Sequence, residues 1–328
     1  MSQGHAAPFD LDVHILRFRA EVTSPLRLPP AGGAALRGAL FAALRAQFCL
    51  AGAGPECGRP SVATSCPVCF LLAPVEAGHR RGQDVPRPYV LRALSQGSLA
   101  YAPGQTLEFE MATFGQALGV FPYALLGIQE MGQRGLGAGR QGGFHLSEVW
   151  AENPLAGRQE RVYRPEDAVV HTPALPVDAA QVAVEAAALA HRGGAQRLRL
   201  SLRSPTRLVE GGRLVKPEAF ELRALLARLL ERLDALGDRY GAGPLGVAFA
   251  PVLRQADAVR VAERRLVWRE LFRASGRHRA QLPMGGLLGD VLLEGDLGPL
   301  LPWLVWGSLV HVGKDATMGN GALRLDAV

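Results

Sequence analysis

The feature that most constrains the fold of this chain is an internal duplication. The pentapeptide Ser24-Pro25-Leu26-Arg27-Leu28 returns in altered form as Ser204-Pro205-Thr206-Arg207-Leu208. Each copy later reaches a glycine-rich turn, Gly135-x-Gly137-x-Gly139 in the first and Gly319-x-Gly321 in the second. From the proline of the pentapeptide to the last glycine of the turn there are 114 positions in the first copy and 116 in the second. Copies of equal length predict two similar domains in tandem.

The same order of secondary structure is expected in each copy. Alternating apolar residues predict opening strands at Val13–Val22 and Arg197–Leu202. Leucine stripes of helical period predict a helix after each strand, beginning at Leu36 and at Leu222. The remaining strands and helices are expected at residues 89–94, 106–113, 122–132 and 144–146, and at residues 259–272, 287–293, 299–310 and 323–325. The order βαββαβ, twice, predicts an α+β fold of two tandem ferredoxin-like (RRM-like) domains.

The domain boundaries are expected in the stretch between the copies. Residues 154–190 are rich in Pro, Ala and Val, which is typical of a linker. The N-terminal domain would then comprise residues 1–153, with a cysteine-rich insertion at residues 49–69. The C-terminal domain would comprise residues 191–328.

The charge balance favours a polyanionic partner only weakly. There are 36 Lys and Arg against 30 Asp and Glu, a net charge of +6, and Lys216 and Lys314 are the only lysines. Arginine binds phosphate in a forked geometry and stacks on bases, although a GC-rich genome enriches the same residue types. Residues 1–8 lack an export signal, and the uncharged stretch at residues 297–313 is too short for a membrane span. We therefore expect a cytoplasmic protein with no membrane partner.

Four cysteines lie in one window and suggest a metal site. Their spacing is C-x7-C-x8-C-x2-C, and they are Cys49, Cys57, Cys66 and Cys69. Four thiolates satisfy tetrahedral zinc, and an iron–sulfur cluster is a second candidate. Such a zinc site would be structural and leave no open position for catalysis. In a reducing compartment the four could also be ordinary thiols.

The second glycine-rich turn, Gly313-Lys314-Asp315-Ala316-Thr317-Met318-Gly319-Asn320-Gly321, has two interpretations. Glycines let backbone N–H groups approach an anion, and Lys314 adds a positive charge, which suits RNA phosphate. Alternatively, Gly319 and Gly321 adopt left-handed turn conformations where a helix passes to the final strand. The two interpretations are compatible.

Besides this turn, further short segments follow one another in a recognisable order along nearly the whole chain. The segments are Gly33, Leu36-Arg37-Gly38-Ala39-Leu40, the four cysteines, Pro86-Arg87-Pro88-Tyr89, Trp268-Arg269, Arg273-Ala274-Ser275, Gly285-Gly286-Leu287-Leu288-Gly289 and His311-Val312-Gly313-Lys314. In this order they resemble the CRISPR repeat-associated (RAMP) superfamily, and within it the endoribonuclease family that cuts precursor CRISPR RNA at its repeats. The resemblance implies repeat RNA and crRNA as partners, and other CRISPR effector subunits as further ones.

The resemblance also implies metal-independent cleavage, with no catalytic metal. The ribose 2′-hydroxyl would attack the adjacent phosphate, leaving a 2′,3′-cyclic phosphate and a 5′-hydroxyl. This reaction requires a base, an acid and a cation at the phosphate. In many members the base is a histidine at the first helix, but residues 34–48 contain none.

The candidate catalytic residues are therefore His79, His311 and Arg37. His79 lies in a basic segment, and the alternative is an exposed loop histidine. His311 precedes the glycine-rich turn, and the alternative is a histidine at a helix C-terminus. Arg37 would be the phosphate cation, or an exposed helix residue. The candidate RNA-binding residues are Gly313, Lys314, Gly319, Gly321, Arg80, Arg81, Arg273, Arg277 and His278.

Three functions remain open at this point. The first is the repeat-cutting nuclease. The second is a non-catalytic RAMP subunit that binds crRNA in an effector complex, which the missing histidine favours. The third, a zinc-stabilised interaction module without RNA, is disfavoured by the duplication and the basic turn.

Overall fold

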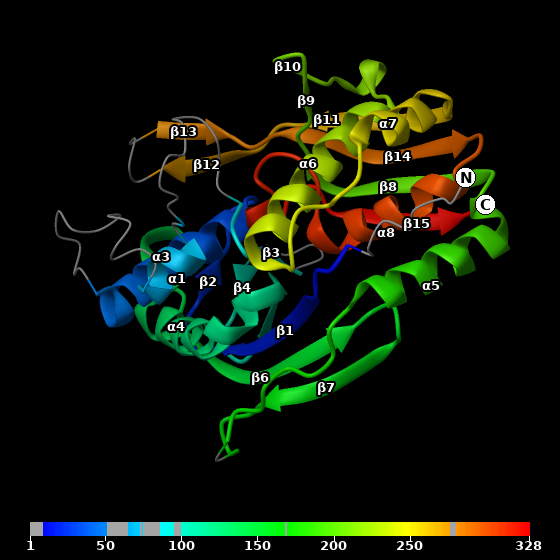
Figure 1. The fold of residues 1–328 in the computed structure, drawn as a ribbon. Helices are drawn as coiled ribbons and strands as arrows, with labels where there is room; N and C mark the ends of the chain where they lie inside the picture. Colours follow the sequence, from blue (N-terminus) through cyan, green and yellow to red (C-terminus); the bar gives the residue numbers. More distant parts are fainter. Residues whose placement is uncertain are drawn as a thin grey trace. The chain divides into compact units, whose positions relative to one another are not determined.

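The structure is a computed structural model that describes residues 9–50, 65–72, 74, 86–94, 100–167, 169–275 and 280–328. The chain forms two compact units (Figure 1). Residues 14–176 form one unit, the N-terminal domain, and residues 1–13 with 177–328 form the other, the C-terminal domain.

The N-terminal domain is a five-stranded sheet with helices on one face. Its elements are β1 (Val13–Val22), β2 (Leu26–Arg27), α1 (Gly32–Phe48), α3 (Pro67–Leu72), β3 (Tyr89–Ala93), β4 (Ala100–Tyr101), β5 (Thr106–Phe114), α4 (Phe121–Arg134), β6 (Phe144–Asn153) and β7 (Arg158–Tyr163). The strands of the main sheet lie in the order β3-β5-β1-β6-β7. Helices α1 and α4 pack on each other and on the sheet, and their buried leucines join the inward face of β1 in one core.

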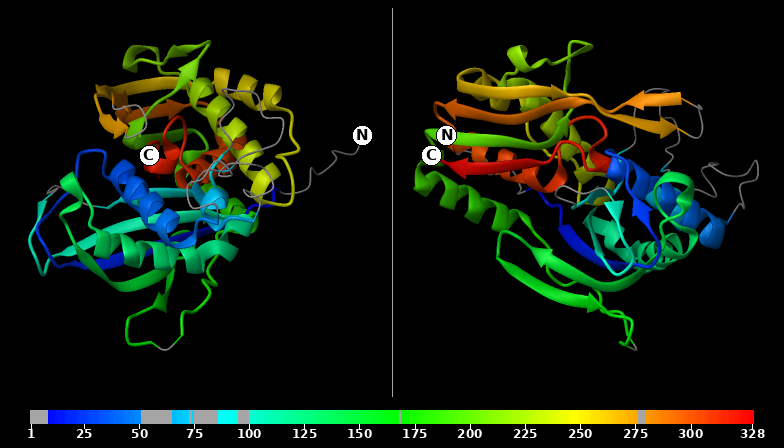
Figure 2. Two further views of the ribbon diagram at one scale, coloured as in Figure 1. Left: turned by 90° about the vertical axis from the view of Figure 1, so that its left-hand side faces the viewer. Right: turned by 180° about the vertical axis from the view of Figure 1, so that it is seen from behind.

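The C-terminal domain repeats this plan with a four-stranded sheet. Its elements are α5 (Ala179–Leu189), β8 (Arg197–Thr206), β9 (Val209–Glu210), β10 (Arg213–Leu214), α6 (Leu222–Tyr240), α7 (Phe249–Asp257), β11 (Arg260–Arg269), β12 (Phe272–Ser275), β13 (Ala280–Pro283), β14 (Gly286–Glu294), α8 (Leu301–Val310) and β15 (Leu323–Ala327). The sheet order is β11-β14-β8-β15. Beyond the sheet, β12 and β13 form a hairpin that projects past the ends of β11 and β14 (Figure 2).

The two sheets confirm the predicted fold. In each domain the βαββαβ core places its strands in the order second, third, first, fourth, which is the ferredoxin-like arrangement. In the second copy, alternating apolar residues form strand β8 as predicted. Leu198, Leu200 and Leu202 are buried on one face of this strand. The leucine stripe of α6 is buried as well, and each fully buried leucine contributes about 1.5–3 kcal/mol.

The segment predicted to be a linker, residues 154–190, contains regular structure instead. Strand β7 extends the first sheet by pairing with β6. Helix α5 begins with a capping box between Asp178 and Gln181 and packs on α8 of its own domain. The division between the domains falls at residues 176 and 177. The alanines of α5 carry little periodic signal, so composition alone resembled a linker.

In the part of the chain that the structure describes, no helix combines the length and apolar character needed to cross a bilayer.

Candidate nucleic-acid interface

Both glycine-rich turns are held by the same serine contacts. In the N-terminal domain the Ser24 hydroxyl donates to the Gln141 carbonyl (2.8 Å) and accepts from the Gly143 N–H (2.7 Å). In the C-terminal domain the Ser204 hydroxyl donates to the carbonyl of Gly319 (2.8 Å) and accepts from the N–H of Ala322 (2.9 Å). The repeated Ser-Pro dipeptide thus anchors the turn to the first strand in each domain.

The glycines are required by close approaches of backbone. A Cβ on Gly137 would lie 2.3 Å from the carbonyl oxygen of Arg27, and one on Gly313 would lie 2.6 Å from that of Arg207. Both glycines have positive φ, +83° and +88°. These are matching positions in the two copies, since Arg27 and Arg207 are each three residues after the anchoring serine.

Several amides of the second turn are already bonded within the protein. Lys314 N–H donates to the Arg207 carbonyl (3.0 Å), Gly319 N–H to that of Ala316 (2.9 Å), and Gly321 N–H to that of Pro205 (3.2 Å). With φ of +84° and +74°, Gly319 and Gly321 have the left-handed conformation of the second interpretation. The predicted phosphate contact through these three amides is therefore disfavoured, because their hydrogens already have acceptors.

The side chain of Lys314 is the exposed cation of this turn. It has no ion pair within the described residues, whereas Lys216 lies over the ring of Trp268, 4.1 Å from its centroid. An exposed ammonium on a rigid turn is suited to a phosphate group.

His311 does not face solvent. It caps the C-terminus of α8, where its N–H donates to the Gly307 carbonyl (3.1 Å), and its side chain is buried. Its Nδ1 lies 2.9 Å from the carbonyl oxygen of Asn320. A catalytic or RNA-contacting imidazole must reach the substrate, so this burial favours the helix-end alternative for His311.

The second turn is fastened to the base of the hairpin. Asn320 Nδ2 donates to the Met284 carbonyl (2.9 Å), and the Arg207 guanidinium donates to that of Pro283 (3.1 Å).

Residues 260–283, which run through β11 and the hairpin, contain seven arginines and two acidic residues. We call the exposed side chains of Arg269, Phe272 and Lys314, together with the partly exposed Arg273, the basic hairpin surface. Arginines with an exposed aromatic ring suit phosphate contact and base stacking. Arg277 and His278 lie outside the described residues.

In the N-terminal domain, Arg37 fixes the end of α3. The guanidinium groups of Arg37 and Arg87 both donate to the Leu72 carbonyl, at 3.2 Å each. Leu72 and Arg87 flank the segment that contains His79, Arg80 and Arg81, which lies outside the described residues. Arg37 therefore holds the Leu72 end of this segment, to which Arg87 is also bonded, and its partial exposure leaves the proposed phosphate contact open.

The described cysteines lie at the two ends of the insertion. Cys66 and Cys69 are buried at the start of α3, and Cys49, which follows α1, is partly buried. Burial raises the pKa of the Cys66 thiol, but hydrogen bonds from the backbone of Leu50, Cys69 and Val68 outweigh it and leave the pKa lowered. Backbone N–H groups directed at a sulfur stabilise the thiolate, the form that binds metal. Cys57 lies outside the described residues, and among those described no group of three or more side chains is arranged to hold a metal ion. Zinc stays a prediction.

On the open face of the N-terminal sheet, arginines form ion pairs with glutamates of the same sheet. Arg19 pairs with Glu108 (2.8 Å) and Glu148 (3.4 Å). Further pairs join Arg92 to Glu110 and Arg17 to Glu152, at 2.8 and 2.9 Å. A hydrogen bond from Trp150 lowers the pKa of Glu148, and the nearby Arg19 lowers it further. These arginines are already paired, so this face is a poor phosphate site.

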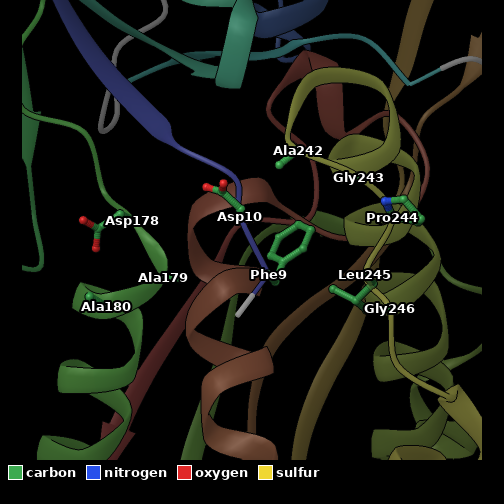
Figure 3. A pocket seen from close by; sticks show the side chains of 10 residues that line it. All are labelled: Phe9, Asp10, Asp178, Ala179, Ala180, Ala242, Gly243, Pro244, Leu245 and Gly246. Carbon is green, nitrogen blue, oxygen red and sulfur yellow. The ribbon is translucent and has the colours of Figure 1, made fainter. Parts of the chain in front are cut away.

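A pocket of about 720 Å³ in the C-terminal domain is also unsuited to RNA (Figure 3). It is lined by Phe9 and Asp10, by the start of α5 at residues 178–180, and by residues 242–246. The carboxylates of Asp10 and Asp178 line it and would repel phosphate. Among the described residues, no basic side chain lines it to offset them.

The sequence reasoning missed the residues that hold the turn in place. Ser204 and Asn320 were not singled out, nor was Arg232, whose Nε donates to the Val310 carbonyl (2.9 Å) at the end of α8. Burial lowers the pKa of Arg232 to about 10. The serine could have been found from its repetition, because it stands at the same place in both copies.

Comparison with known proteins identifies the class and then the family. Residues 11–175 match the family model of the AF_1859 N-terminal domain, and residues 200–323 match that of the CRISPR-associated endoribonuclease Cas6. By fold, the chain is a protein of two tandem ferredoxin-like domains with a glycine-rich turn before the last strand. Over residues 11–175 it belongs to the family of the AF_1859 N-terminal domain, and its residues 200–323 are similar to the Cas6 endoribonuclease family.

Solved structures agree in fold. A Cas6 product complex has a TM-score of 0.51 and 16% identity over 96% of this chain and 100% of that chain. Thermus thermophilus Cas6 has a TM-score of 0.50 and 14% identity, covering 96% and 99%. A partial Cas6-RT-Cas1–Cas2 complex has a TM-score of 0.57 and 15% identity, covering 97% of this chain and 46% of that longer chain. No curated protein sequence matches significantly.

Proposed function

We propose that this protein cuts precursor CRISPR RNA within its repeats and thereby produces mature crRNA. The match of residues 200–323 to the Cas6 endoribonuclease family supports this, and the basic hairpin surface is the structural observation that carries it. There exposed Lys314 lies on a turn that is bonded, through Asn320 and Arg207, to the base of the hairpin, and the hairpin carries exposed Phe272 and partly exposed Arg273. We propose that the activity takes place in the cytoplasm, because the proposed substrate is a transcript.

The proposed chemistry is metal-independent attack by the ribose 2′-hydroxyl, which yields a 2′,3′-cyclic phosphate and a 5′-hydroxyl. His79 is the candidate base, because His311 is buried and residues 34–48 contain no histidine. Arg37, held at the Leu72 end of the His79 segment, is the candidate cation for the phosphate whose charge increases in the transition state.

The decisive experiment incubates the protein with labelled repeat RNA in EDTA. We expect cleavage, with products that carry the two termini above, and no cleavage of RNA with a 2′-deoxy substitution at the scissile nucleotide. Product from the deoxy substrate would exclude the mechanism. His79→Ala should abolish cutting and spare binding. The matched control His171→Ala, at an exposed histidine of the same domain, should leave both cutting and binding unchanged.

A second candidate function is a non-catalytic subunit that binds crRNA within an effector complex. The absence of histidine from residues 34–48 favours it. The same assay distinguishes the two, since a mobility shift without cleavage would select the binding subunit. One structural relative is part of a Cas6-RT-Cas1–Cas2 complex, and we propose other CRISPR proteins as partners here too.

We propose a structural zinc ion bound by Cys49, Cys57, Cys66 and Cys69. The lowered thiol pKa at Cys66 and the burial of Cys69 support it, because both features suit a closed tetrathiolate site. Purified protein should contain one zinc per chain by elemental analysis, and Cys69→Ser should lose it. Retention of iron would select a cluster, and the absence of both metals would leave four ordinary thiols.

A further inference from the structure

His311 occupies a backbone position that is glycine in the other copy. Helix α4 ends at Gly135, with φ 86° and ψ 149°, and α8 ends at His311, with φ 62° and ψ 162°. The next residue in each copy, Leu136 or Val312, donates its N–H to a glycine carbonyl at the far side of the turn, at 2.8 and 2.9 Å. The glycine after that lies over the carbonyl of the equivalent arginine in both copies. Gly135 and His311 are thus matching residues.

This backbone conformation is unfavourable for histidine. Positive φ with ψ near 160° is populated almost entirely by glycine, because a Cβ collides with neighbouring backbone. A residue with a side chain persists there when the surrounding contacts hold it, and such outliers gather at functional sites. The first copy shows that glycine satisfies the turn, so the histidine has a role that glycine lacks.

The imidazole of His311 connects the two ends of the turn. A carbonyl can only accept, so the Nδ1 that faces the Asn320 carbonyl at 2.9 Å carries the proton. Asn320 in turn donates to the Met284 carbonyl at the base of the hairpin (2.9 Å). Both side chains are buried, His311 at 3% and Asn320 at 4% exposure, where a hydrogen bond is shielded from water.

We propose that His311 is a positioning residue for RNA. It holds the glycine-rich turn closed, so that Lys314 keeps its place on the turn that is bonded to the base of the hairpin, in the arrangement that binds the RNA backbone. This rests on the proposed function, and it assigns His311 no contact with the reacting atoms.

The test is His311→Gly, which installs the residue of the first copy. Removal of the unfavourable conformation should keep the melting temperature at or above that of wild type. Loss of the imidazole contact should lower kcat/KM for repeat RNA about tenfold, because small displacements of positioning groups cost that much or more. Hydrogen exchange at residues 313–321 should become faster in the free protein. His311→Asn, which retains a side-chain hydrogen-bond donor, should recover part of the activity. The control is His171→Gly on an exposed loop.

Each outcome decides one point. If wild type neither binds nor cuts RNA, the proposed function fails, and the exchange rates still decide whether His311 holds the turn. If wild type is active and His311→Gly matches it in both exchange and kcat/KM, the positioning role is overturned. A strongly destabilised His311→Gly would overturn the equivalence with Gly135.

Discussion

The two glycine-rich turns share their backbone and differ in their side chains. Each is anchored by a serine hydroxyl and crosses an arginine carbonyl at a glycine. Where the first turn has Gly135, Ala138 and Gly139, the second has His311, Lys314 and Asp315. The duplication therefore preserved what the turn needs to form. The substituted positions carry side chains that could give the second turn a function of its own.

The N-terminal sheet and the hairpin region of the C-terminal domain show a related contrast in charge. On the N-terminal sheet, Arg17, Arg19 and Arg92 are each paired with a glutamate. In the C-terminal domain, Arg269 and Arg273 have no ion pair within the described residues. The number of arginines alone thus says little about RNA binding, because a paired arginine must lose its partner before it meets a phosphate.

The largest expected effect comes from glycines of the shared scaffold. A Cβ at Gly321 would lie 1.9 Å from the Val312 carbonyl oxygen, and one at Gly135 would lie 2.0 Å from that of Arg140. Gly321→Ala and Gly135→Ala should each lower the free energy of unfolding by about 3 kcal/mol or more, measured by chemical denaturation.

Gly104→Ala is the matched control for these two variants. Gly104 also has positive φ, +84°, but a Cβ there meets no atom within 4 Å. Its cost should be limited to the backbone conformation, about 1–2 kcal/mol. Equal losses in all three variants would show that the close contacts contribute nothing.

The sequence predicted the repeated elements well, for a physical reason. Strand β1 was predicted at its observed bounds, since alternation and a bounding turn fix a strand locally. Helix α5 and strand β7 were missed because alanine-rich and polar segments acquire structure by packing on α8 and pairing with β6.

The site could be predicted only in part. Lys314 and Arg273 were predicted from charge and motif, and both are at least partly exposed in the structure, while their contact with RNA stays a prediction. The burial of His311 and its contact with Asn320 depend on how α8 meets the final strand, which is a tertiary property. The hydrogen bonds that the amides of Gly319 and Gly321 make within the protein also depend on tertiary structure, so the glycine pattern of the sequence does not predict them.

The next effect is smaller and should be equal in the two copies. Ser24→Ala and Ser204→Ala each remove a hydroxyl that both donates and accepts, leaving a backbone N–H and a carbonyl without that partner. We expect each to cost about 1–2 kcal/mol of stability by thermal or chemical unfolding. A much larger loss in one copy would show that the anchors are not equivalent.

Replacement of Lys314 should show that the two turns differ in RNA binding rather than in stability. Lys314→Ala should weaken repeat RNA binding about fivefold and reduce the slope of log affinity against log salt by about 0.7–0.9, because one phosphate contact is lost. Arg140→Ala, an exposed cation on the first turn, should change neither. Equal losses from both variants, measured by titration at several salt concentrations, would mean that both turns bind RNA.

The smallest effect concerns the paired sheet. The Trp150 indole N–H donates to Glu148 (3.0 Å) and, with Arg19, lowers the pKa of that carboxyl below its ordinary value of 4.5. A lowered folded-state pKa means that ionised Glu148 stabilises the fold above about pH 4.5, and that this contribution is lost as the pH falls through the folded-state pKa. Trp150→Phe should therefore reduce stability at pH 7 by about 0.5 kcal/mol, and less at pH 3. If the difference between wild type and Trp150→Phe is the same at both pH values, protonation of Glu148 does not control this face of the sheet.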